Sequence, residues 1–280
     1  MKHVMLDAYG CEENQLSNIL HINSFLNELS YVMGLEPVAP PTLIPYYYGS
    51  VKEDVGISAY VLLKGGHITI HTFPLRECYF VDCFSQKDFD ENEFYKLFYK
   101  KFHFDEEKSL FKSTDRNKGG RIINQYTPQV DFGPHYMAKI KMDKAPTMEE
   151  MFDFLENIVS NIGMDEITRA NVIKDNVDSP EWLSGIIIIA QSHISLHYNY
   201  KENVIYTDIF SCAPFDYTTL DDEYKVLGEI TECELIPRGT KHLYKVNSKI
   251  ESEVLKADTK WQRVVRKVKK WKLQRWLLEL

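Results

Sequence analysis

The stretch Leu183-Ser-Gly-Ile-Ile-Ile-Ile-Ala-Gln-Ser-His-Ile-Ser-Leu-His197 decides the fold, because the chain carries it twice. The earlier stretch Gly56-Ile-Ser-Ala-Tyr-Val-Leu-Leu-Lys-Gly-Gly-His-Ile-Thr-Ile-His71 repeats the first serine and both histidines at an offset of 126 residues. Asp82 and Asp208, in the segments that follow, keep the same offset. Chance does not hold one spacing over so many positions, so the sequence indicates a tandem duplication.

Both copies predict the same order of elements. In the first copy, His3 begins a strand, and an amphipathic helix is expected after it. The apolar face of this helix is formed by Leu16, Ile19, Ile22, Leu26, Leu29 and Met33. In the second copy a strand begins at His135, and Pro146-Thr147 with two glutamates in the next turn starts a helix. A further helix is expected from Glu91 to Phe102. The stretch from Asp105 to Gly120 is typical of a loop-rich connection between the copies.

These elements predict an α+β protein made of two tandem two-layer α/β sandwich units. The units are expected at residues 1–120 and 121–280, with their sheets stacked as αββα. Such stacking would place a pseudo-two-fold interface inside a single chain, which is the geometry that the fusion of a homodimer leaves.

The composition is that of an ordinary globular protein, with 280 residues, 44% of them hydrophobic, and a net charge of −8. The acidic balance argues against nucleic-acid binding. The sequence has neither a run of about 18 apolar residues nor a signal-peptide pattern, so we expect a cytoplasmic protein with no membrane span. The five cysteines lack CxxC spacing, which predicts free thiols rather than disulfides or a zinc site.

The last 21 residues, from Lys260, differ in charge from the rest, because they contain eight Lys or Arg and one Glu. They predict a basic amphipathic helix with Trp261, Trp271 and Trp276 among its apolar positions. Such a helix can bind a membrane surface or a partner protein. Docking of the tryptophans on the acidic body of the same chain is the simpler interpretation.

Residues two apart on a strand share a face, and this rule assigns the side chains of the second repeat to the two faces of its strand. Ile194 and Leu196 are expected on one face, and His193 and His197 on the other. Ser192 begins the strand, where its hydroxyl is free to face a site. No carboxylate or cysteine with ligand spacing accompanies the two histidines, so no metal site is expected there.

The second copy resembles the prokaryotic S-adenosylmethionine decarboxylase family. In that family two serines are eight residues apart, and a histidine directly follows the second serine. A second histidine comes four residues after the first histidine, and a cysteine lies twenty residues after the second serine. Every spacing is matched by Ser184, Ser192, His193, His197 and Cys212. The likeness covers roughly residues 1–105 and 133–225.

The resemblance implies a self-cleaving, pyruvoyl-dependent enzyme that makes decarboxylated S-adenosylmethionine for polyamine synthesis. Ser192 would attack the carbonyl of Gln191, and His197 would act as general base and remove the Ser192 α-proton. The products would be residues 1–191 and 192–280, the latter beginning with a pyruvoyl group. Cys212 would return a proton to the substrate carbon, and Ser184 would assist by hydrogen bonding near the scissile peptide.

The first copy lacks the nucleophile and the cysteine, since Gly66 and Gln86 replace them. Its two histidines, His67 and His71, are expected to remain as supports for packing or hydrogen bonds. The resemblance implies that the first copy instead forms a wall of the substrate site. The candidate substrate-binding residues are Phe73, Tyr47, Tyr48 and His193. One active site per chain follows, and two fused chains could still associate as a homodimer.

Two substrate classes remain open. The family commonly has a glutamate for ribose hydroxyls, but Leu75 and Lys201 occupy its two candidate positions, and Gln191 stands where a glutamate commonly precedes the cleaved serine. A pyruvoyl-dependent arginine or ornithine decarboxylase is therefore the alternative small-molecule enzyme. A non-catalytic regulatory paralogue that binds an active decarboxylase is the alternative from another class.

Overall fold

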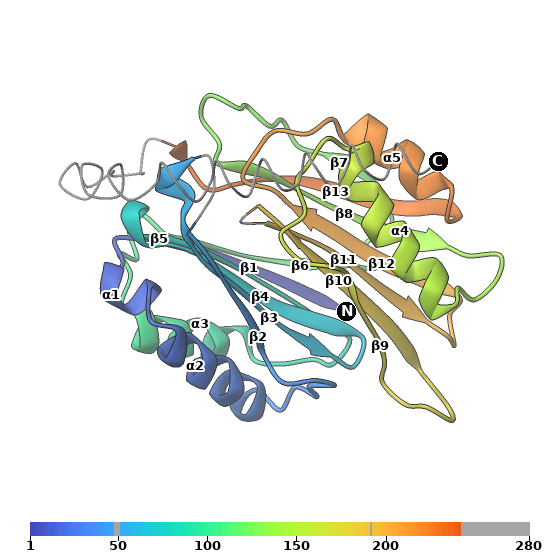
Figure 1. The fold of residues 1–280 in the computed structure, drawn as a ribbon, viewed down its shortest axis with the longest axis horizontal. Helices are drawn as coiled ribbons and strands as arrows, with labels where there is room; N and C mark the ends of the chain where they lie inside the picture. Colours follow the sequence, from blue (N-terminus) through green and yellow to red (C-terminus); the bar gives the residue numbers. More distant parts are fainter. Residues whose placement is uncertain (48–50, 191, 242–280) are drawn as a thin grey trace, which may run out of the picture.

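The computed structural model describes residues 1–47, 51–190 and 192–241. Within these ranges the chain is α+β, with two sheets and few helices, as the sequence predicts (Figure 1). The first sheet has the strand order β2-β3-β4-β5-β1-β6. Its strands are β1 (Lys2–Tyr9), β2 (Thr42–Tyr46), β3 (Gly56–Leu63), β4 (Gly66–Phe73), β5 (Cys78–Ser85) and β6 (Leu110–Asp115).

The second sheet takes its strands from the second half of the chain, in the order β7-β13-β8-β12-β11-β10-β9. Its strands are β7 (Gly120–Ile123), β8 (Gly133–Lys141), β9 (Asn171–Lys174), β10 (Trp182–Ile189), β11 (Ser192–Asn199), β12 (Val204–Phe210) and β13 (Glu229–Arg238). The antiparallel run β10-β11-β12 corresponds to β3-β4-β5 of the first sheet. The duplicated sequence therefore occupies equivalent places in the two sheets.

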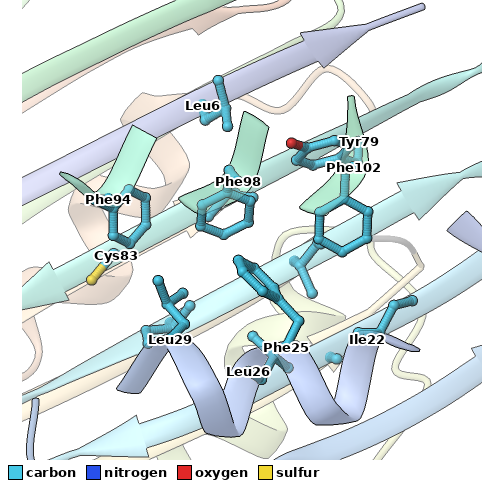
Figure 2. Close-up of a cluster of buried hydrophobic side chains, with 14 of the residues drawn as sticks. Leu6, Ile22, Phe25, Leu26, Leu29, Tyr79, Cys83, Phe94, Phe98 and Phe102 are labelled. Atoms are coloured by element: carbon cyan, nitrogen blue, oxygen red, sulfur yellow. The ribbon is translucent and has the colours of Figure 1, made fainter. Parts of the chain in front are cut away.

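Helices pack on one side of each sheet (Figure 1). The first sheet carries α1 (Glu13–Leu16), α2 (Ile19–Val32) and α3 (Glu91–Phe102), and two short 3-10 helices, η1 (Lys52–Asp54) and η2 (Pro74–Arg76), lie in its loops. Figure 2 shows Phe25 of α2 meeting Phe98 and Phe102 of α3 above the sheet, with ring centroids 4.7 and 5.2 Å away. Residues four apart on a helix share a face, so α3 presents these phenylalanines together.

The second sheet carries α4 (Met148–Asn161) and α5 (Tyr217–Lys225). The predicted start of α4 is confirmed, because the Thr147 hydroxyl accepts from the Glu150 N–H while the Glu150 carboxylate accepts from the Thr147 N–H. Such a capping box satisfies two amides that the first helical turn leaves unpaired. The predicted bounds of the helix from Glu91 to Phe102 are also confirmed.

Two predictions about the first half were wrong. The helix expected from Leu16 onward is broken, because the Asn18 side chain accepts from the His21 N–H and starts α2 anew at Ile19. Asparagine competes for backbone amides in this way at helix starts. The stretch from Asp105 to Gly120 also contains β6, which pairs with β1 at the sheet edge. An edge strand with mostly exposed side chains lacks the apolar alternation that reveals inner strands.

Some predicted features lie outside the described residues, namely the basic C-terminal helix from Lys260, Tyr48 and Gln191. Of the helices that the structure describes, none combines the length and apolar character needed to cross a membrane.

The faces of the sheets that carry no helices contact each other. Ile194 and Leu196 pack among the helix-side residues of the second sheet. His193 and His197 point the other way and hydrogen-bond to histidines of β4, so the predicted alternation along β11 is confirmed. Apolar contacts between β3 and β10 join the same two faces. The duplicated strands therefore meet across one buried interface.

The interface between the sheets also buries charge. Arg238, at the end of β13, is fully buried and donates from Nε to Asp7 at 2.7 Å and from Nη1 to Asp82 at 2.6 Å. Both carboxylates belong to the first sheet. Burial alone would raise the pKa of Asp82, but Arg238 and His135 outweigh burial and hold that pKa well below its usual value. Arg238 thus ties the second sheet to the first through two charged partners.

Replacing Arg238 with methionine leaves two buried carboxylates without their cation, which costs about 3–5 kcal/mol. We expect the free energy of unfolding, measured by urea titration, to fall by this amount at pH 7. The deficit should shrink at pH 5, because the Asp82 pKa rises without Arg238 and protonation then removes the buried charge.

A matched control is Lys101→Met, which removes a surface ion pair with Glu28 and should cost less than about 1 kcal/mol. An Arg238→Met loss that is as small as the control, or that is equal at both pH values, would contradict this account.

Candidate functional site

Strand pairing brings Ser192 and Cys212 together. Ser192 is the first residue of β11, and Cys212 follows the end of β12, the antiparallel neighbour of β11. The Ser192 hydroxyl accepts from the Cys212 backbone N–H at 2.9 Å, and the Cys212 thiol donates to the Ala190 carbonyl at 3.3 Å. The predicted nucleophile and the predicted proton donor are therefore neighbours.

The Cys212 thiol lies against residues of both halves. It packs on an aromatic cluster that includes Phe73 and Phe80 from the first sheet and Phe210 from β12. Burial, supported by the nearby Asp54 carboxylate, raises the pKa of Cys212 to about 12. The group is therefore a protonated thiol at neutral pH, which suits a proton donor and not a thiolate nucleophile.

The structure does not bring His197 and Ser184 to Ser192. His197 stands five residues further along β11, about 16 Å away at roughly 3.3 Å per residue. Its Nδ1 accepts from the Ser184 hydroxyl at 2.9 Å, and its Nε2 lies 2.9 Å from Nδ1 of His67. The spacing along the sequence is matched, but an extended strand carries the two groups to opposite ends.

A serine and a histidine of the first copy are instead bonded to His193, the residue after Ser192. The Ser58 hydroxyl lies 2.8 Å from Nδ1 of His71, and Nε2 of His71 lies 2.9 Å from Nδ1 of His193. Because His193 directly follows Ser192, this pair approaches the end of β11 that holds the nucleophile. His193, predicted to bind substrate, instead hydrogen-bonds to His71 and to Asp208.

Each copy directs its serine–histidine pair toward the other copy because the two copies are related by a pseudo-two-fold axis. β4 and β11 face each other in opposite directions, since His67 meets His197 at one end and His71 meets His193 at the other. Each site therefore combines the strand start of one copy with the serine–histidine pair of the other. Alignment of the two repeats could have pointed to this pair, because Ser58 and His71 are the counterparts of Ser184 and His197.

The remaining substrate-binding candidates are spread out. Phe73 lies beside the site but is fully buried, edge-on to Phe80 and Phe132 with ring centroids at 5.7 and 5.3 Å. Tyr47 is half exposed and hydrogen-bonds to Ser17, next to α1. Leu75 is buried in η2, and the adjacent Arg76 forms an ion pair with Asp54 at 2.7 Å.

The equivalent position in the first copy is closed by packing. Gly65 corresponds to Gln191 and has a φ of 65°, and a Cβ there would overlap the indole of Trp182. At Gly66, the counterpart of Ser192, a Cβ would overlap the carbonyl oxygen of Phe84. Trp182 is itself 1% exposed. The first copy therefore has no space for a serine nucleophile where the second copy has Ser192.

Two groups of buried side chains lie close enough to hold a metal ion: His3, Asp82 and His135, and His3, His67 and Asp208. Arg116 donates to Nδ1 of His3 at 3.1 Å, so the lone pair of neutral His3 is on Nδ1 and Nε2 carries the hydrogen. Arg238 imposes the same tautomer on His135 by donating to its Nδ1 at 2.9 Å. Nε2 of His3, 3.7 Å from Oδ1 of Asp82, is therefore a hydrogen donor, which disfavours metal ligation by His3, whereas Nδ1 of His135 lies 3.3 Å from the same oxygen.

The fold and the site together define a duplicated α+β protein in which a serine–cysteine pair of one half is followed by a histidine bonded to a serine–histidine pair of the other. The family model described as S-adenosylmethionine decarboxylase matches residues 2–116 and 137–226. The chain therefore belongs to the S-adenosylmethionine decarboxylase family, as a tandem duplication.

Two curated relatives are named S-adenosylmethionine decarboxylase proenzyme, from Thermoanaerobacter sp. (strain X514) and Thermoanaerobacter pseudethanolicus (strain ATCC 33223 / 39E). Each is 32% identical over 89 residues, which is 31% of this chain and 64% of the relative. Among solved structures, "Crystal Structure of an Unknown Protein from Galdieria sulphuraria" aligns over 85% of this chain and 96% of its own at 6% identity. Its TM-score of 0.21 is too low to bear on the fold.

The closed first-copy position predicts that Gly66→Ser does not create a second reactive serine. The added side chain has to displace the backbone of β5, so we expect a loss of about 1–3 kcal/mol in the free energy of unfolding. Lys87→Ser, at an exposed surface pair, should be nearly silent. Mass spectrometry of the denatured Gly66→Ser chain tests the prediction, and a new break before residue 66 would contradict it.

Proposed function

We propose that the protein is a pyruvoyl-dependent decarboxylase that cleaves itself between Gln191 and Ser192 and acts on S-adenosylmethionine in polyamine synthesis. One observation carries the proposal. Ser192 and Cys212 are held together at the start of β11, and the next residue, His193, is bonded to a hydroxyl–imidazole pair from the other half of the chain. The name proenzyme in the curated relatives supports a chain that is cut.

Cleavage begins with attack of the Ser192 hydroxyl on the carbonyl carbon of Gln191. The peptide C–N bond breaks, an ester forms, and the Ser192 amine becomes free. Removal of the Ser192 α-proton then breaks the bond between Cβ and Oγ, and residue 191 leaves as a carboxylate. Protonation of Cβ and hydrolysis of the resulting imine by water release ammonia and leave the pyruvoyl group.

The base for the α-proton is His71, not His197. Burial, followed by the influence of His193, lowers the pKa of His71 well below 6.5, so the imidazole is neutral at physiological pH. The Ser58 hydroxyl donates to Nδ1 and keeps the lone pair on that nitrogen. Ser184 and His197 form the corresponding pair at the closed first-copy position.

The residues around Ser192 fit a pyruvoyl group, because they are buried, carry a protonated thiol and include a neutral base. Bound to an amino acid through its amino group, pyruvoyl withdraws the electrons that departing CO₂ leaves behind. Cys212 then delivers the proton to the substrate carbon. Its raised pKa suits this role, because the thiol holds its proton until a strongly basic carbon approaches.

The substrate class depends on the wall that the first copy supplies. Asp54 and Arg76 are charged groups close enough to influence the Cys212 pKa, and Leu75 between the aromatic cluster and Arg76 is apolar. Aromatic faces near the thiol favour a nucleoside or sulfonium substrate. The Asp54 carboxylate favours the second candidate, arginine or ornithine, whose side chains are cationic.

The proposal also includes the domain bounds, the stacking of the sheets, the localisation and the partners. We place the functional units at residues 1–120 and 121–280, with their sheets stacked as αββα, in a cytoplasmic enzyme that binds a small-molecule substrate and no nucleic acid. Association of two fused chains as a homodimer is compatible with a site that one chain completes by itself. A non-catalytic paralogue remains the competing hypothesis, and it predicts an uncleaved chain.

Self-cleavage is tested by the intact mass of the denatured protein. We expect two fragments, residues 1–191 and 192–280, the second beginning with pyruvoyl and therefore lighter than a serine-started chain by the mass of one ammonia. Ser192→Ala should remain a single chain because it lacks the attacking oxygen. A parent chain that stays whole on long incubation would overturn the proposed processing and favour the non-catalytic paralogue.

The assignment of the base is tested by comparing His71→Gln with His197→Gln. Loss of a general base slows a proton transfer by about 10²–10⁴-fold. We expect His71→Gln to slow fragment formation by this factor and His197→Gln to slow it far less, followed by mass spectrometry after cell-free synthesis. The opposite order would return the role to His197.

The substrate is identified by the release of labelled CO₂ from S-adenosylmethionine, arginine and ornithine in separate assays of the cleaved protein. Release from S-adenosylmethionine is expected. Release only from arginine or ornithine would reject this substrate while retaining the cofactor, and Asp54→Asn should then abolish the activity because it removes the carboxylate that recognises the cationic side chain.

A further inference from the structure

We infer that His193 and Asp208 form a hydrogen-bonded relay with His71 and hold that histidine in the protonation state that processing requires. The inference rests on the proposed function. It makes His193 and Asp208 positioning residues, since neither contacts the reacting atoms and both act through His71.

The tautomers follow from the partners. Asp208 is a carboxylate that only accepts, so Nε2 of His193, 3.1 Å from its Oδ2, carries a hydrogen. With that hydrogen on Nε2, Nδ1 of His193 accepts from Nε2 of His71 at 2.9 Å. The lone pair of neutral His71 is on Nδ1, which accepts from the Ser58 hydroxyl. Every hydrogen-bond donor of the relay therefore points toward Asp208. The nitrogen with the free lone pair, Nδ1 of His71, is at the end away from Asp208.

Asp208 is held as a charged acceptor. Ser195 donates to its Oδ1, and His135 and His193 donate to its Oδ2 at 3.2 and 3.1 Å. Burial alone would raise the pKa of Asp208, but His67 and the hydrogen bonds from His135 and His193 hold it well below its usual value. The terminus of the relay is thus an anion inside the protein, where a charge acts strongly on its neighbours.

The charged and titratable groups that face the relay come from both sheets. Around His71 these are His193 on β11, Asp82 on β5 and Arg238 on β13. Around Asp208 they are His3, His67, His135, His193, His197, Tyr224 and the Arg116 guanidinium.

The closed first-copy position has the same relay with its last link broken. Ser184, His197 and His67 repeat the first three members with separations of 2.9 Å at both links. Nε2 of His67, however, has no hydrogen-bond partner within the described residues and lies 3.8 Å from Asp208. The counterpart aspartate, Asp82, is taken by Arg238. The chain therefore keeps a complete relay only at the position that has a nucleophile.

The relay acts when His71 takes the α-proton of Ser192 at Nδ1. The imidazolium that forms donates from Nε2 to His193, which donates in turn to Asp208, so the new positive charge is stabilised without protonating the carboxylate. The buried aspartate of the serine proteases serves its catalytic histidine in this way. The proton held at Nδ1 is later returned to Cβ, so the relay is restored when the pyruvoyl group is complete.

The first experiment compares His193→Gln with His67→Gln in the full chain. The two positions are pseudo-symmetric counterparts, fully buried and bonded to one histidine of the other copy. Fragment formation should slow at least about 10-fold in His193→Gln, since loss of an aspartate behind a catalytic histidine costs up to about 10⁴-fold. His67→Gln should stay within about threefold, because no proton step passes through it. Equal slowing would overturn the relay.

The second experiment is the pH profile of processing in Asp208→Asn. In the parent chain the rate should stay level as pH falls through 6.5, because His71 remains neutral there. Removing the anion weakens the base, so the plateau should fall and the acidic limb should move to lower pH. A fall in rate without displacement of that limb would show a merely structural role for Asp208 and reject the inference.

Nitrogen-15 NMR of labelled histidines, recorded on Ser192→Ala, shows which ring nitrogen of each histidine carries hydrogen in a chain that cannot cleave itself. His71 and His193 should both be neutral with hydrogen on Nε2, and Asp208→Asn in that background should shift their signals more than those of His67 and His197. Hydrogen on Nδ1 of either histidine would overturn the relay even if the chain cleaves. A parent chain that does not cleave, with the expected tautomers, would reject processing as the use of the relay and the proposed function with it.

Discussion

The buried polar interface between the two sheets is the constraint on which the rest of the structure depends. Arg238 and the aspartates that it contacts are removed from water, and a buried charge is tolerated only with its partner in place. Hydrogen bonds are directional and short, so they fix how one sheet lies on the other more tightly than apolar packing does. The same register brings His71 to His193, on which the site depends.

Duplication within one chain explains how such an interface came to be asymmetric. Two identical subunits would form two identical sites, because every contact from one residue to a second across the interface would be repeated with the subunits exchanged. In a fused chain the halves can diverge. Here one position keeps Ser192 and Cys212, whereas the other is closed by Trp182 against Gly65. The charge network diverges as well, since His135 reaches Asp208 at 3.2 Å while His3 remains 3.7 Å from Asp82.

The buried histidines illustrate how environment assigns roles to one residue type. Desolvation lowers the pKa of His3 to about 4 and that of His197 to about 3, so these imidazoles are neutral connectors at physiological pH. Guanidinium groups on one side and carboxylates on the other then set which nitrogen carries the hydrogen. The interface is consequently an ordered set of donors and acceptors.

The sequence by itself determined the duplication, the α+β class, the bounds of α3 and the cap of α4, because each depends on spacing or on side chains close along the chain. It also predicted that Ser192 and Cys212 belong together, and strand pairing places them side by side. Only the tertiary structure decided that the serine–histidine pair of the first copy is bonded to His193, the residue next to Ser192. The repeat gives His71 and His197 equal standing, and the choice depends on two strands from different copies facing each other in opposite directions, which is a relation in space that no spacing along the chain records.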